Sequence, residues 1–215
     1  MASVPTGTTF FVASAFNASK VTTAITNAAE AVVTSAAHGY SNGDILEVTS
    51  GWGRLNLRPF RVKTVTTDTF VLEGCDTSNT NFFPPGTGVG SVRKVSAFTQ
   101  IQQVLAVSSS GGDAKNVEYK YVESDVSNSI NDGFSATSYA LDIDADSIST
   151  AGYAALKTLT DVQTNTIMKM VTRSGANVLQ GCTVALNEAP SIADGQVMKV
   201  KASFNGTSRL VRYAN

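Results

Sequence analysis

The stretch that decides the fold is 45-ILEVTSGWGRLNLRPFRVKTVTTDTFVLE-73. It holds three short runs rich in β-branched and aromatic residues, which favour strands, and residues that favour turns separate them. The runs cover Ile45–Thr49, Arg58–Val65 and Thr69–Glu73, with turns at 51–56 and 67–68. Short strands separated by turn residues in this way predict a small antiparallel β-barrel or β-sandwich.

The flanking residues extend the pattern. Val32–Thr34 predicts a further short strand, and residues 38–44 form a turn rich in residues that tolerate positive φ. A loop rich in proline and glycine at 84–90 then closes the run of strands. We therefore expect residues 32–95 to form a small β-barrel-like module within one domain that spans residues 1–215.

Residues 96–215 are expected to form a sandwich core with a long hairpin at its start. The apolar run Phe98–Val107 predicts one strand, and Val117–Val122 predicts a returning strand with Val117, Tyr119 and Tyr121 on one face. The pair would make a hairpin over residues 98–122. Its expected flexible tip, a candidate assembly site, consists of Ser108, Ser109, Ser110, Gly111, Gly112 and Asp113.

The sequence predicts one α-helix. Ser149 and Thr150 can cap a helix over residues 150–163, whose apolar side chains recur at helical spacing and should cover a sheet. The Ala/Thr-rich segment 21–31 fits either a weak helix or an irregular strand. The remaining strands are expected at Ile167–Val171, Gly181–Leu186, Val197–Phe204 and Ser208–Tyr213. The predicted fold class is thus mainly β, an antiparallel β-sandwich or barrel with one flanking α-helix.

The amino-acid composition bears on which classes of function the protein can have. Charged residues make up 15% of the 215 residues, well below the usual quarter, and the net charge is −1. A dedicated nucleic-acid-binding protein usually has a basic excess, which this chain lacks. A polar surface of Ser, Thr, Asn and Gly is easily buried against another subunit, because little charge must be desolvated.

The sequence also gives expectations about compartment. Cys75 and Cys182 allow one bridge but no dense disulfide framework. Residues 1–16 lack the basic and apolar regions of a signal peptide, and no apolar run approaches the roughly 20 residues that span a bilayer. We expect a protein made in a cytoplasm, with no membrane partner.

Catalytic, cofactor and metal sites are not expected. His38 is the sole histidine and lies in a turn, where hydrogen bonding is its ordinary role. Asp142, Asp144 and Asp146 resemble the start of a calcium loop, yet Ser147 stands where that loop needs Gly and Tyr153 where it needs Glu. Negative charge before a helix N-terminus is the favoured interpretation of this acidic segment.

A local basic cluster leaves an alternative function open. Arg54, Arg58, Arg61 and Lys63 lie close in sequence to Trp52, which could stack on a base. A solvated sheet face or pairing with acidic groups of a neighbouring subunit, and a core position for the tryptophan, are the favoured interpretations. A nucleic-acid-binding β-barrel that uses these residues is nevertheless the second functional hypothesis.

Several motifs resemble those of tail tube proteins from long-tailed, non-contractile bacteriophages. The best match covers about residues 38–95, and the later order of strands and helix also fits. The motifs, in chain order, are Pro5–Thr8, His38–Asp44, Gly51–Asn56, Phe60–Val62, Thr69–Gly74 and Gly86–Lys94.

The resemblance implies a structural virion protein of the tail, assembled in the host cytoplasm. It implies six subunits per ring and rings stacked into a hollow tube around a tape measure protein. Tail terminator and distal tail proteins would cap the tube, and genomic DNA would pass through it without specific binding. The family brings no catalytic residues. Another tail component, a terminator or a baseplate hub protein, remains an alternative.

Overall fold

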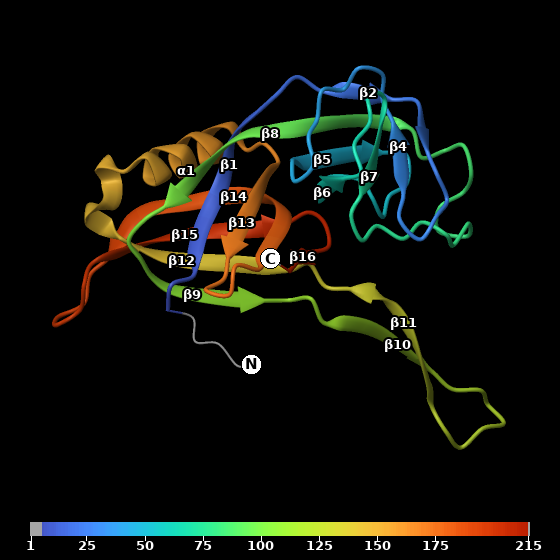
Figure 1. Cartoon of the computed structure of the whole chain (residues 1–215). Coiled ribbons are helices and arrows are strands. Elements are labelled where there is room, and N and C mark those ends of the chain that lie inside the picture. Colours follow the sequence, from blue (N-terminus) through green and yellow to red (C-terminus); the bar gives the residue numbers. More distant parts are fainter. Residues whose placement is uncertain (1–5, 215) are drawn as a thin grey trace.

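A computed structural model describes residues 6–214 and shows a mainly β protein with one α-helix, as predicted (Figure 1). The helical segments are the 3₁₀ helix η1 (Ala145–Ser149) and α1 (Ala151–Val162). The strands are β1 (Thr9–Phe16), β2 (Lys20–Thr22), β3 (Ala24–Ile25), β4 (Val32–Thr34), β5 (Ile45–Ser50), β6 (Arg58–Lys63), β7 (Thr69–Leu72), β8 (Gly90–Ile101), β9 (Val104–Ser110), β10 (Ala114–Tyr119), β11 (Asn128–Phe134), β12 (Ser138–Asp144), β13 (Thr166–Val171), β14 (Asn177–Ser191), β15 (Lys199–Gly206) and β16 (Val211–Tyr213). The motif at Pro5 lies partly outside the described residues.

Most strands belong to one curled antiparallel sheet of 14 strands. Its hydrogen-bonded order is β3-β4-β7-β6-β5-β8-β1-β13-β14-β15-β12-β9, with β16 beside β14 and β2 beside β8. Strands β10 and β11 form a separate two-stranded ribbon. The antiparallel β architecture with a flanking helix, which the spacing of strands and turns predicted, is therefore confirmed.

Two large hydrophobic cores lie in this sheet. Strands β2–β7 are inserted between β1 and β8, which pair with each other, and they enclose a core of their own. Its fully buried large side chains include Trp52, Phe60 and Phe70. The Ala/Thr-rich segment 21–31 contributes the short strands β2 and β3 to this module and no helix.

Helix α1 covers one face of the remaining sheet, against β14, β8 and β1 (Figure 1). Thr150 caps it as expected, because its side chain accepts a hydrogen bond from the Tyr153 backbone N–H. Tyr153 and Leu156 are buried and Leu159 is half-buried, whereas Val162 is 60% exposed. The predicted apolar face is therefore correct except at its C-terminal end.

The strand β16 joins the module to the sandwich. Its Tyr213 is buried, and the phenolic oxygen accepts a hydrogen bond from the Arg61 backbone N–H at 2.9 Å. The same hydroxyl donates to the carbonyl oxygen of Glu73 at 3.3 Å. Burial raises the pKa of Tyr213 to about 12, so the hydroxyl stays protonated and keeps its donor at neutral pH.

The expected strand pairing within residues 98–122 is wrong. Gln103 has a positive φ of 57°, which ends β8 at Ile101 and lets β9 turn away to pair with β12. The returning strand β10 pairs with β11, not with β9. The result is a longer hairpin in which β9 and β10 lead out and β11 and β12 lead back (Figure 1).

Candidate assembly surfaces

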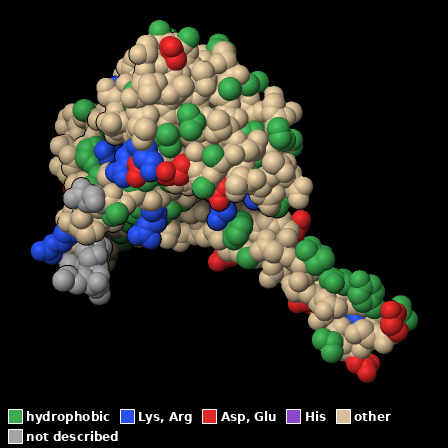
Figure 2. All heavy atoms as spheres, turned by 45° about the vertical axis from the view of Figure 1, so that its right-hand side comes forward, with side chains coloured by type: hydrophobic (Ala, Val, Ile, Leu, Met, Phe, Trp, Pro, Cys, Tyr) green, Lys and Arg blue, Asp and Glu red, His purple; other side chains and the backbone are tan. Residues whose placement is uncertain are grey.

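The ribbon β10–β11 projects from the body of the molecule and is exposed along its whole length (Figures 1 and 2). Val117 faces Ile130 across the ribbon, so the two side chains lie on one side of it. Tyr119 and Tyr121 contact each other edge to face at 5.4 Å between ring centroids. An amphipathic ribbon of two strands is only marginally stable in water, so this element needs a partner surface.

The same ribbon and its flanks are acidic. Five acidic and two basic residues lie between residues 111 and 137, which gives this segment a net charge of −3. Figure 2 shows acidic and hydrophobic side chains gathered on the projection. The ion pairs found within residues 6–214 all lie in the body, and none involves a side chain of this segment.

The residues expected at the hairpin tip lie at its base instead. Ser108, Ser109 and Ser110 end β9 and pair with β12, opposite Ala140, Tyr139 and Ser138. Gly111 and Gly112 follow with positive φ values of 79° and 85°, and there the chain bends from the body into the ribbon. The turn at the far end spans residues 120–127, so the strand predicted as far as Val122 ends earlier, at Tyr119.

A second incomplete surface is the sheet edge at β9. This strand ends the path of the 14-stranded sheet, so one side of its backbone has no strand partner among the described residues. Leu105 and Val107 are 49% and 45% exposed, although Val107 lies opposite the buried Leu141. An exposed edge strand with apolar side chains is a template for pairing with another chain.

The face of β9, β12 and β15 that lies away from the helix is polar. A shallow groove on it is lined by Tyr139, Ala140, Lys201 and several small hydroxyl or amide side chains: Ser108, Ser109, Ser110, Ser138, Ser203 and Asn205. Lys199 is paired with Asp142 at 2.6 Å, so its charge is balanced locally. This face therefore combines small side chains with little net charge.

The candidate catalytic and metal residues have structural roles. His38 is 3% exposed, its Nδ1 accepts a hydrogen bond from the Tyr40 backbone N–H, and its ring stacks on that of Tyr40. Asp142 binds Lys199, and Asp144 caps η1 by accepting from the backbone N–H of Asp146. Residues 6–214 contain no cluster of three or more His, Cys, Asp or Glu side chains fit to hold a metal ion.

The two cysteines are buried in different cores, Cys75 in the module and Cys182 in the sandwich, and neither forms a disulfide. Burial raises the pKa of the Cys75 thiol to about 11 and that of Cys182 to about 12. Both thiols are therefore protonated and act as small core side chains. Within the described part of the chain, no helix has the length and apolarity to span a membrane.

The residues of the nucleic-acid hypothesis do not form a common surface. Trp52 is 2% exposed, and its indole N–H donates to the carbonyl oxygen of Pro84 at 2.8 Å. Arg61 is held by Glu73, and Lys63 pairs with Glu30. That hypothesis requires an exposed tryptophan on which a base can stack, and the buried Trp52 does not provide one.

An open strand edge and a projecting ribbon are features typical of a subunit that completes its surfaces against a neighbour. The comparison with known protein families identifies the family: the model of the phage tail tube protein family matches residues 50–215. The chain belongs to this family. A search of curated proteins found no match.

Proposed function

We propose that the chain forms hexameric rings that stack into the tube of a phage tail, the conduit through which the genome leaves the virion. The observation that carries the proposal is the pair of incomplete surfaces: the unpaired edge of β9 and the exposed apolar side of the ribbon β10–β11. Both surfaces would be completed by identical neighbours.

Ring closure is assigned to the sheet edge. Backbone groups along the outer side of β9 can pair with a strand of the adjacent subunit, and Leu105 and Val107 would be buried in the same contact. A closed ring leaves no free edge, which explains how an edge of seven residues is tolerated.

Stacking is assigned to the hairpin. The ribbon reaches away from the body and would lie on a subunit of the next ring, where Val117, Tyr119 and Ile130 find an apolar contact. The segment Ser108–Asp113 then serves assembly as the bend that sets the direction of the ribbon, rather than as its contacting tip.

The lumen is assigned to the polar face of β9, β12 and β15. Hydroxyl and amide side chains with little net charge would offer DNA no array of cations to hold its phosphates, so the genome can slide. During assembly the same face would surround a tape measure protein, with terminator and distal tail proteins at the tube ends.

Electron microscopy tests this proposal. Purified protein, alone or with tail initiation proteins, should form hollow tubes with six-fold symmetry. A chain that stays monomeric at high concentration under both conditions would contradict it.

A further inference from the structure

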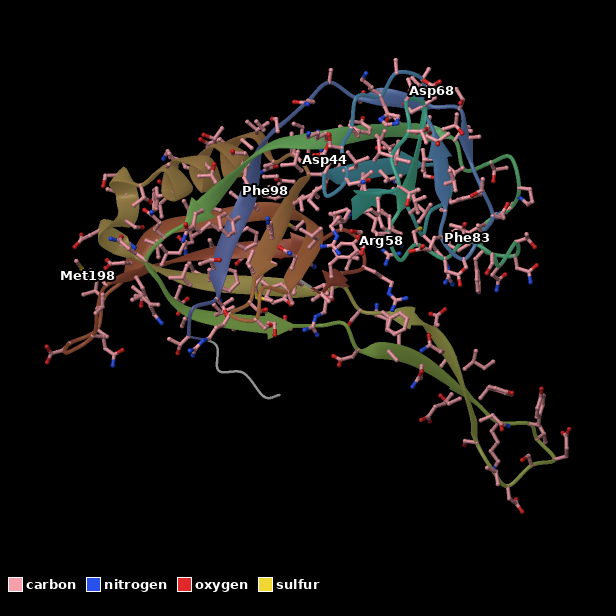
Figure 3. All side chains as sticks on the ribbon, viewed as in Figure 1. Asp44, Arg58, Asp68, Phe83, Phe98 and Met198 are labelled. Carbon is pink, nitrogen blue, oxygen red and sulfur yellow. The ribbon has the colours of Figure 1, made fainter. Side chains whose placement is uncertain are left out.

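Two arginines near the base of the hairpin lack an anionic partner. Arg58 lies on β6, between the module and the hairpin base in the view of Figure 3. Arg209 stacks its guanidinium over the ring of Phe134, the last residue of β11, at 4.5 Å. Neither forms an ion pair with a carboxylate of residues 6–214.

Burial makes the position of Arg58 costly in an isolated chain. Its Nε atom is buried without a hydrogen-bond partner in the described structure, and its guanidinium lies 5.0 Å from the ring centroid of Phe60. Burial lowers the pKa of Arg58, and the positive charge of the nearby Arg209 also lowers it. A half-buried cation with a like-charged neighbour requires an anion from elsewhere.

The chain also carries carboxylates that have no ion-pair partner among the described residues. The turn of the hairpin presents Glu123 and Asp125, both outside the ion pairs of the body. The same molecule does not supply them to Arg58, because its ribbon projects away from that residue (Figure 3). A second copy of the chain can.

We propose that the Arg58–Arg209 pair is a carboxylate receptor for the acidic hairpin turn, Glu123 and Asp125, of another copy of this chain. This inference rests on the proposed assembly and names the polar contact that directs it.

Charge reversal in the full-length chain tests the receptor. Arg209→Glu alone, and Glu123→Lys with Asp125→Lys, should each raise the critical concentration for tube formation about tenfold or more, measured by sedimentation. The chain with all three changes should assemble better than either parent, because the carboxylate at position 209 then pairs with the new lysines, although Arg58 keeps its positive charge. Asp161→Lys on the exposed part of the helix is the control and should assemble normally.

Cross-linking gives a second measurement. Arg209→Cys with Asp125→Cys, assembled above its raised critical concentration and then oxidised, should yield covalent oligomers, since both native cysteines are buried. The control pairs Asp125→Cys with Arg173→Cys, another exposed arginine outside the ion pairs, and should cross-link far less.

The outcomes separate the two proposals. If wild-type tubes form but Arg209→Glu has no effect, or the triple variant is no better than its parents, the receptor is wrong while tube assembly stands. If the wild-type chain never polymerises, both proposals fail.

Discussion

Glu47 is the side chain whose charge is most deeply buried in an ion pair of this protein. It is 3% exposed, and its carboxylate accepts hydrogen bonds from Nε and Nη2 of Arg93 at 2.8 and 3.0 Å. Arg93 also donates to the carbonyl oxygen of Asn165 and lies over the ring of Phe16. One ion pair thus connects the module strand β5 with β8 and with the loop before β13.

Replacing Glu47 by Ala should lower the free energy of unfolding by about 3 kcal/mol, because it leaves a largely buried guanidinium without its carboxylate. Urea denaturation measures the change. Glu30→Ala is the matched control: its pair with Lys63 is well exposed, so the expected loss is below about 1 kcal/mol. Equal losses in the two variants would show that burial does not set the strength of the Glu47 pair.

For single residues, the sequence predicted whether a side chain has a structural role better than it predicted which residue that side chain contacts. A structural His38 and a buried Trp52 follow from their turn context: His38 hydrogen-bonds within its turn, and Trp52 lies between two glycines and anchors its turn in the core. The partner of Arg61, Glu73, directly follows β7, and the partner of Arg93, Glu47, lies on β5. Such pairs depend on strand register, which alternation of residue types leaves open.

Among the elements, the bend at Gly111 is the most sensitive. A Cβ atom there would lie 2.0 Å from the carbonyl oxygen of Ala136, and φ is +79°. The substitution Gly111→Ala therefore carries the cost of positive φ, about 1–2 kcal/mol, and also forces the backbone of the bend to move. Because the residue lies outside both cores, the body should stay folded while the ribbon changes direction.

Gly111→Ala should consequently lower the yield of tubes, counted by electron microscopy, with little change in the melting temperature of the monomer. Gly195→Ala controls for the backbone cost, since Gly195 also has positive φ, +72°, but its Cβ would meet no atom within 4 Å. Wild-type tube yield from Gly111→Ala would refute the role of the bend.

The helix and strands that are bounded by clear turn or capping residues were predicted with nearly correct bounds. The strands β4 to β7 and the helix α1 fall where turn residues and capping residues place them. The strand β11 was missed, because Asn131-Asp132-Gly133 has the composition of a turn although the segment pairs with β10. The break at Gln103 was missed because no glycine or proline marks it.

At the scale of the whole molecule, the fold class and the family followed from the sequence, whereas the two assembly surfaces did not. A free strand edge is defined by sheet order, and sheet order arises from contacts distant in sequence, such as β9 with β12 and β1 with β13. The polar composition predicted burial against a subunit, and we propose the β9 edge and the ribbon β10–β11 as the surfaces for it.

Hydrogen exchange of the β9 backbone measures the central claim most directly. In the monomer, the amides of residues 104–110 that point away from β12 should exchange rapidly, as should those of the ribbon turn. In assembled tubes both groups should become protected by at least tenfold, while the amides of α1 and of the module core stay unchanged. Tubes in which the outer β9 amides exchange as fast as in the monomer would contradict the account, because the sheet edge would then remain open.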